Sequence, residues 1–298
     1  MTSHVENEIA DQPACWRRVA ELAASRVVAG LPERGERVAV VGCGTSRFIG
    51  GAYAALREGA GQGETDAFAA SEMPRGRRYD RVLALTRSGT TTEVLELLDR
   101  LRGTVAVTAV TAGPDTPVVS AADQVVVLDF ADERSVVQTR FATSALALFR
   151  AHLGEDLTGA IDDAERAVHE PLPDGMANIT QFTFLGSGWT VGLADEAALK
   201  LREASLGWAE SYSAMEYRHG PIAVTTGGSV VWMFGPAPEG LAEQVATIGG
   251  RWVQQDLDPV ASLITVQRLA VARGIARGLD PDVPRHLTRS VILRSASV

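Results

Sequence analysis

Val38-Ala-Val-Val-Gly-Cys-Gly-Thr-Ser46 is the stretch that determines the fold class of this 298-residue chain. Its apolar run predicts a buried strand, its two glycines predict a tight turn, and Arg47–Glu58 then follows as a helix. A strand that passes through a glycine turn into a helix opens the βαβ unit of a parallel sheet. We therefore expect an α/β protein whose ligands bind at the carboxyl edge of a sheet.

The same order of elements recurs along the chain. Further strands are predicted at Asp66–Ala70, Arg81–Leu85, Thr104–Val110 and Gln124–Phe130. Later in the chain, the strand Gln181–Leu185 runs into Gly186-Ser-Gly-Trp189 and a helix, as Val38–Val41 runs into its own glycine turn and helix. This repeat indicates an internal duplication. Strands at Ser229–Phe234 and Arg251–Gln254 and helices at Gly240–Gly249 and Val260–Gly278 complete a second unit with one strand fewer.

These elements predict two domains. We expect a leading helical segment over residues 1–36, with its helix over 5–29 packed on the body of the protein. The first domain then covers residues 37–153 and the second covers 154–279, joined near a Pro- and Gly-rich break that follows a helical stretch over 155–176. An extended tail over 280–298 completes the chain.

Composition restricts the possible functions. The net charge is −9 and no long basic run occurs, so nucleic acid is not expected as a partner. Cys15 and Cys43 are too few for a disulfide framework or a zinc knuckle. The polar start is not a signal peptide, and the sequence contains no apolar run long enough to span a membrane. We expect a cytoplasmic protein with no membrane partner.

A second loop rich in hydroxyl groups follows the strand Arg81–Leu85. It reads Thr86-Arg-Ser-Gly-Thr-Thr-Thr-Glu93 and precedes the helix Val94–Leu101. Free backbone N–H groups and hydroxyls at a helix N-terminus favour a phosphate group. Ordinary capping by a threonine with Glu93 is the simpler alternative, but a cap uses only one or two hydroxyls. The Gly42 loop is a weaker candidate for a nucleotide, since Arg47 replaces the third glycine of a dinucleotide fingerprint.

Lys200 is the only lysine in a sequence that otherwise uses arginine. Unlike arginine, a lysine amine can lose and regain a proton near neutral pH. Glu196, Lys200 and Glu203 have helical spacing that places them on one face. A solvated salt-bridge stripe, at about 0.2–0.5 kcal/mol per pair, is the simple reading. A carboxylate base beside an ammonium is an arrangement that can remove a proton from the carbon next to a carbonyl group.

In their order, these segments resemble the double SIS (sugar isomerase) family, and in particular the isomerase half of glucosamine-6-phosphate synthase without its glutaminase domain. The resemblance rests on the two loops above and on three segments around Lys200 and one in the tail: Glu196–Glu203, Ala209–Tyr212, Arg218–Pro221 and Pro284–Val291. It implies two tandem SIS domains, each a parallel sheet flanked by helices in a flavodoxin-like three-layer sandwich. It also implies a homodimer and requires no cofactor or metal.

The resemblance also implies roles for individual residues. Those that would bind or line a sugar 6-phosphate are Thr45, Ser46, Thr86, Arg87, Ser88, Thr91, Val136 and Arg289. Glu203 would move the C2 proton, and Lys200 would orient the carbonyl end of the sugar or shuttle protons there. His219 would open the sugar ring, reaching across a dimer interface.

Departures from the family pattern leave the reaction open. Arg289 stands where the synthase pattern has a lysine able to form an imine, and Gln138 and Arg140 differ near the substrate. No glutaminase segment is present, so glutamine is not expected as the ammonia source. A hexosamine 6-phosphate isomerase or deaminase is the first expectation. An N-acetylglucosamine-6-phosphate dehydratase that eliminates the C3 hydroxyl is the alternative, and a non-catalytic sugar-phosphate sensor is the third.

Overall fold

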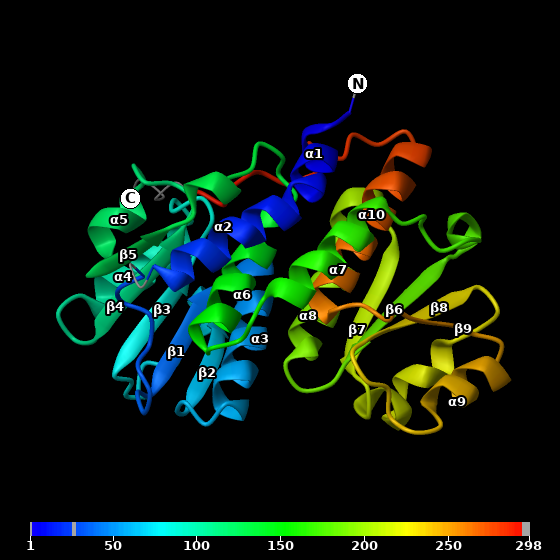
Figure 1. Ribbon diagram of the computed structural model, residues 1–298, viewed down its shortest axis with the longest axis horizontal. Coiled ribbons are helices and arrows are strands. Elements are labelled where there is room, and N and C mark those ends of the chain that lie inside the picture. Colours follow the sequence, from blue (N-terminus) through cyan, green and yellow to red (C-terminus); the bar gives the residue numbers. More distant parts are fainter. Residues whose placement is uncertain (1, 26–27, 294–298) are drawn as a thin grey trace.

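The computed structural model describes residues 2–25 and 28–293. Figure 1 shows two sheets at opposite ends of the molecule with a layer of helices between them. The expected α/β fold, with two parallel sheets flanked by helices, is confirmed.

The first sheet has five parallel strands in the order β2-β1-β3-β4-β5. Its strands are β1 (Val38–Gly42), β2 (Thr65–Ala69), β3 (Arg81–Leu85), β4 (Ala106–Thr111) and β5 (Gln124–Val127). The inner face packs on α2 (Gln12–Ala24), α3 (Thr45–Gly59) and α6 (Arg140–His152), and the outer face on α4 (Thr92–Leu101) and α5 (Pro117–Ala121). This strand order is that of flavodoxin-like sheets, which bind ligands where the strand order reverses.

The second sheet repeats this plan with four parallel strands in the order β7-β6-β8-β9. Its strands are β6 (Gln181–Gly186), β7 (Trp208–Ser213), β8 (Ser229–Phe234) and β9 (Arg251–Gln254). Helices α7 (Thr158–His169), α8 (Thr190–Ser205) and α10 (Pro259–Ala276) cover its inner face, and α9 (Leu241–Thr247) covers its outer face. The inner helices of the two sheets therefore pack against one another and form one shared hydrophobic core.

Several sequence predictions were wrong in detail. The leading helix is two helices, α1 (His4–Ala10) and α2, because Pro13 lacks the N–H that would continue the first helix into the second; residues 26–27 of the predicted helix lie outside the described residues. The predicted strand over 124–130 ends at Val127 in a 3₁₀ turn, and the helical stretch over 155–176 is confined to α7. The edge strand β7 was not predicted, since only Ala209 in it is buried.

The inner helices α3 and α8 come into close contact at Gly192. A Cβ atom at Gly192 would lie 2.5 Å from the carbonyl oxygen of Phe48 and 2.9 Å from the backbone nitrogen of Ala52. Neither backbone atom can move without shifting α3. The glycine therefore permits the approach that brings the first turn of α3 beside the middle of α8.

We expect Gly192→Ala to lower the free energy of unfolding by about 3 kcal/mol, the upper end of the usual cost of overpacking. Gly51→Ala on α3 is the matched control, because a Cβ there meets nothing within 4 Å. That substitution should be neutral or stabilise by about 0.5–1 kcal/mol, since glycine is costly inside a helix. Urea denaturation of both variants checks the contact, and equal stabilities would show that the helices are not held at this point.

Within the described part of the chain, no helix is both long and apolar enough to cross a lipid bilayer.

Candidate active site

The centre of the candidate site is a buried cluster on α8. Lys200 Nζ lies 2.5 Å from Glu203 Oε2 and 3.4 Å from Glu196 Oε1. Glu196 and Lys200 are fully buried, whereas the side chain of Glu203 is 18% exposed. The predicted shared face of the helix is confirmed, and a solvated salt-bridge stripe is excluded because two of the three charges lie inside the protein.

Burial and charge act in opposite directions in this cluster. Burial raises the pKa of Glu196 to about 8, although the Lys200 ammonium opposes the shift. Burial alone would lower the pKa of Lys200, but the carboxylates of Glu196 and Glu203 outweigh it and raise that pKa. A proton on Glu196 removes one of the two negative charges that face Lys200 near neutral pH. Glu203, partly exposed and 2.5 Å from the Lys200 ammonium, is the carboxyl group placed to accept a proton from a substrate.

This arrangement predicts a pH dependence of stability. A carboxyl group whose pKa is raised from 4.5 to about 8 keeps its proton in the folded state after the unfolded chain has lost it. Its contribution is complete below pH 4.5 and is lost as the pH rises to about 8, at roughly 1.4 kcal/mol per pH unit. Glu196→Gln should remove this slope, and Glu21→Gln, an exposed carboxylate on α2, should keep it. Denaturation at several pH values checks this, and an unchanged slope in Glu196→Gln would show that Glu196 is ionised.

Thr45 joins this cluster to the first sheet. It is the first residue of α3 and is 4% exposed. Its hydroxyl accepts a hydrogen bond from Lys200 Nζ at 3.1 Å and donates one to Glu196 Oε1 at 3.3 Å. Ser46 follows it in the same turn and is equally buried. The turn that joins β1 to α3 thus lies against the cluster on α8, although the two are about 150 residues apart in the chain.

The loop between β3 and α4 forms a cradle of hydroxyl groups at the N-terminus of α4. Thr91 is the N-cap of α4, yet its side chain makes no capping hydrogen bond. Instead the hydroxyls of Ser88, Thr90 and Thr91 all lie within 3.3 Å of Ser290 Oγ, at 3.2, 2.9 and 3.3 Å. The simple capping interpretation is therefore wrong for these side chains. They converge on one point beside the positive end of a helix.

The C-terminal tail places the Ser290 hydroxyl in the cradle. Val291 accepts a hydrogen bond from the backbone N–H of Thr92, and the N–H of Leu293 donates to the Thr92 hydroxyl. Figure 1 shows the red tail leaving α10 and crossing to the first sheet. The N-terminal segment secures it, since the backbone N–H groups of His4 and Val5 donate to Asp282. A phosphate group entering the cradle has to displace the Ser290 hydroxyl.

Arg87 is buried and braces the site. Its guanidinium pairs with Glu133 at 3.3 Å and donates to the carbonyl oxygens of Ser135, Val136 and Arg289. Glu133 in turn accepts from the backbone N–H groups of Thr139 and Arg140 at the start of α6. The side chain of Arg87 therefore holds the loop over 133–139 and the tail together. Its position supports a role in shaping the site.

The other predicted substrate residues lie around this loop. Thr86 directly follows β3 and is buried, and Val136 donates its backbone N–H to the Asp282 carbonyl. Arg289 forms an ion pair with Asp132 at 2.5 Å, and Arg140 forms one with Asp11 at 2.8 Å. Both arginines are thus held by carboxylates outside the Lys200 cluster.

His219 is not brought to the cluster within one chain. It ends the 3₁₀ turn Glu216–His219 that follows β7, and its side chain is exposed. In residues 2–25 and 28–293, no hydrogen bond or ion pair joins it to Lys200 or Glu203. The same described residues contain no group of three or more His, Cys, Asp or Glu side chains able to hold a metal ion.

Sequence reasoning missed three residues at the site. The first is Glu133, which is fully buried and whose charge acts on the pKa of Lys200. Ser290 occupies the cradle, and Thr90 was not separated from its two neighbours. A glutamate that precedes a polar loop and a helix start is a usable signal for the first. The other two depend on a contact between residues about 200 positions apart.

No protein-family model matches the chain. Over 316 aligned positions it is 30% identical to the glutamine–fructose-6-phosphate aminotransferase (isomerizing) of Symbiobacterium thermophilum, covering 86% of this chain and 51% of that protein. The corresponding protein of Sulfurisphaera tokodaii is 25% identical over 293 positions, with 86% and 50% covered. The chain thus spans about half the length of the curated relatives it matches.

Solved structures match nearly the full length of the chain. The glucosamine-6-phosphate deaminase of Thermotoga maritima has a TM-score of 0.80 and 25% identity, covering 98% of this chain and 100% of that one. The C-terminal domain of the Francisella tularensis glucosamine-fructose-6-phosphate aminotransferase has a TM-score of 0.77 and 21% identity, covering 95% and 99%. The chain therefore has the SIS-domain fold of sugar-phosphate isomerases and deaminases, and it resembles the isomerase half of glucosamine-6-phosphate synthase.

Proposed function

We propose that the chain is an enzyme that removes the C2 proton of a hexosamine 6-phosphate and completes an aldose–ketose isomerisation with deamination. The observation that carries the proposal is the buried Glu196–Lys200–Glu203 cluster, joined through Thr45 to the sheet edge that holds the hydroxyl cradle. A phosphate held in the cradle fixes the far end of the sugar, so binding energy remote from the reaction orients C2.

The reaction then follows from the charges of the cluster. Glu203 takes the proton from C2, the electron pair forms a C1–C2 double bond, and the C1 oxygen gains a proton. Lys200 stabilises the charge that develops on that oxygen. Return of the proton to C1 leaves an imine at C2, and water hydrolyses this imine to the ketose and ammonia. Each step uses only groups of this chain, the sugar and water.

A second outcome is favoured by one observation. Lys200, the only lysine of the sequence, is held as an ammonium by Glu203, and Arg289 carries a guanidinium paired with Asp132, so neither side chain supplies a neutral amine for an imine with the sugar. With an N-acetyl group on C2, the same carbanion would expel the C3 hydroxyl as water. We therefore keep N-acetylglucosamine-6-phosphate dehydration as the alternative fate of the same intermediate.

We further propose two SIS domains over 37–153 and 154–279, and a homodimer in which His219 acts in the neighbouring site. The repeated strand order of the two sheets supports the first proposal. The second proposal is supported by exposed apolar side chains that precede His219 in the sequence and could pack against a second copy of the chain. They are Leu206, Trp208 (68% exposed) and Met215. Mixing Glu203→Gln with His219→Ala protein should restore activity in hybrid dimers. The absence of rescue after demonstrated subunit exchange would place His219 in its own chain's site.

The identity of the product distinguishes the deaminase, the dehydratase and the sensor from one another. The chain is incubated separately with glucosamine 6-phosphate, N-acetylglucosamine 6-phosphate and fructose 6-phosphate, and the products are followed by mass. We expect loss of ammonia from glucosamine 6-phosphate. Loss of water from the N-acetyl sugar would establish the dehydratase instead. Tight binding of all three sugars without turnover would show a sugar-phosphate sensor and overturn the proposal.

Ser88 tests the cradle. Ser88→Ala should raise the KM for the phosphorylated sugar about tenfold, because a hydrogen bond to a charged group contributes about 1.5–3 kcal/mol. The kcat should change little, since Ser88 is remote from C2. Ser71→Ala, an exposed serine before β3, is the matched control and should behave as wild type. An unchanged KM in Ser88→Ala would place the phosphate elsewhere.

A further inference from the structure

A cavity of about 790 Å³ lies at the opposite edge of the first sheet from the cradle. It is lined by the loop over 73–79, by the last turns of α4 at Leu97–Leu101, by Val82 near the start of β3, and by Val105 just before β4. Thr92, at the other end of α4, belongs to the cradle. The cavity is therefore separate from the candidate active site, at the far end of the same helix.

Arginines surround this cavity in a chain with a net charge of −9. They are Arg75, Arg77, Arg78 and Arg100. Arg77 pairs with Asp66 at 3.1 Å and lies over the ring of Phe68. Among the residues that the structure describes, the other three make no ion pair within 4.0 Å. Three of the four arginines around the cavity are thus not neutralised by a carboxylate partner within the described residues, and positive charge is concentrated here.

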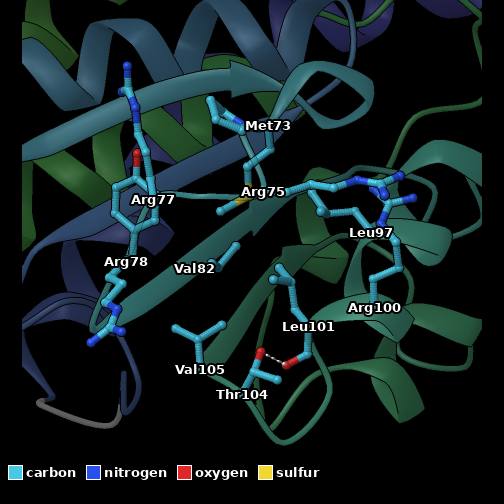
Figure 2. Close-up of a pocket in the computed structure, with 12 residues that line it drawn as sticks. Met73, Arg75, Arg77, Arg78, Val82, Leu97, Arg100, Leu101, Thr104 and Val105 are labelled. Atoms are coloured by element: carbon cyan, nitrogen blue, oxygen red, sulfur yellow. Dashed lines mark hydrogen bonds between the residues drawn. The ribbon is translucent and has the colours of Figure 1, made fainter.

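The interior of the cavity is apolar between these charges. Val82 is fully buried, Leu97 is 3% exposed, and Met73, Leu101 and Val105 are half-buried. In the view of Figure 2, Arg75 and Arg100 extend toward the same side of the cavity, with Val82, Leu101 and Val105 between them and Arg78. The cavity volume falls in the range of small-molecule sites, about 300–1,000 Å³.

We propose that this cavity binds a small phosphate ester that carries two or more negative charges and an apolar or aromatic body, the chemistry of a nucleoside diphosphate. Guanidinium groups match phosphate oxygens in a bidentate geometry, so Arg75 and Arg100 hold the phosphates. The apolar floor formed by Val82, Leu101 and Val105 receives the body of the ligand. A ligand with only a phosphate group or only an apolar body would use half of this lining, whereas a phosphate ester with an apolar body uses both the arginines and the apolar floor.

Titration calorimetry of the full chain with ADP tests the site. Arg75→Gln and Arg100→Gln should each raise the Kd for ADP about tenfold, the loss expected for one charge-assisted contact. Arg102→Gln is the matched control, because Arg102 carries the same charge two residues further on, outside the cavity, and pairs with Asp99. Its Kd should stay within about twofold of the wild-type value. Pyrophosphate and adenosine should each bind more weakly than ADP.

Several results would overturn the assignment. ADP binding that is lost in Ser88→Ala but kept in Arg100→Gln would place the phosphates in the cradle. Equal loss in Arg102→Gln and Arg100→Gln would show a diffuse surface charge effect. Pyrophosphate that binds as tightly as ADP would remove the role of the apolar floor, and no binding of ADP at millimolar concentration would exclude the site. None of these outcomes depends on whether the protein turns over a sugar phosphate.

Discussion

Glu203→Gln should reduce kcat on the sugar 6-phosphate by about 10³-fold while leaving KM within about threefold of wild type. The amide keeps the hydrogen bond from Lys200 but cannot accept the C2 proton, and a positioned general base contributes about 10²–10⁴-fold. The cradle is unchanged, so the phosphate still binds. Steady-state kinetics with the substrate identified by the product masses checks both parameters.

Asp195→Asn is the matched control for this variant. Asp195 lies on the same helix, away from the cluster, and accepts a hydrogen bond from Ser211 that an amide oxygen can also accept. Its kcat should stay within about threefold of wild type. If Glu203→Gln retains wild-type turnover, Glu203 is not the base, and Glu196 after loss of its proton is the other carboxylate of the cluster that could accept one.

Lys200→Met should have a comparable effect on kcat, by about 10²–10³-fold, because it removes the charge that stabilises the developing oxyanion. It should also lower the free energy of unfolding by about 3–5 kcal/mol, since it breaks a buried ion pair and leaves Glu203 without its partner. Activity and stability therefore fall together in the single variant. Kinetics and urea denaturation measure the two losses separately.

A double variant separates the two roles. Glu196→Gln combined with Lys200→Met removes the cost of keeping a buried carboxyl group protonated in the folded state, so part of the stability should return. The activity should not return, because no cation faces the substrate oxygen. Recovery of activity along with stability would show that Lys200 only supports the fold, and the chemistry would then need another cation.

The backbone plan was predictable where local patterns were strong. The strands Arg81–Leu85, Ser229–Phe234 and Arg251–Gln254 have the predicted bounds, because apolar or β-branched runs there end at turn residues. The edge strand Trp208–Ser213 has no such run. It was not predicted because most of its positions are polar and half-buried. The spacing of Glu196, Lys200 and Glu203 was sufficient to predict their shared face, because helical period is a local property.

The long-range parts of the site were not predictable in this way. Arg87 was expected beside the phosphate, but its contact with Glu133 and with the Arg289 carbonyl is set by the packing of a loop and a tail that no local period describes. The same holds for Ser290, whose hydroxyl lies in the cradle through a contact with Thr90, 200 residues away in the chain. The depth of Glu196 also follows from the packing of α8 between α3 and α10, which turns an ordinary carboxylate into one with a raised pKa.

The most direct test of the account is the fate of the C2 hydrogen. The wild-type protein is incubated with glucosamine 6-phosphate in D₂O, and the recovered sugar and product are examined by NMR. The proposed site predicts that deuterium enters at C2 of the recovered sugar or at C1 of the ketose, and that Glu203→Gln prevents both. A sugar that binds tightly yet gains deuterium at neither carbon would contradict proton removal at C2 and with it the assignment of Glu203 and Lys200.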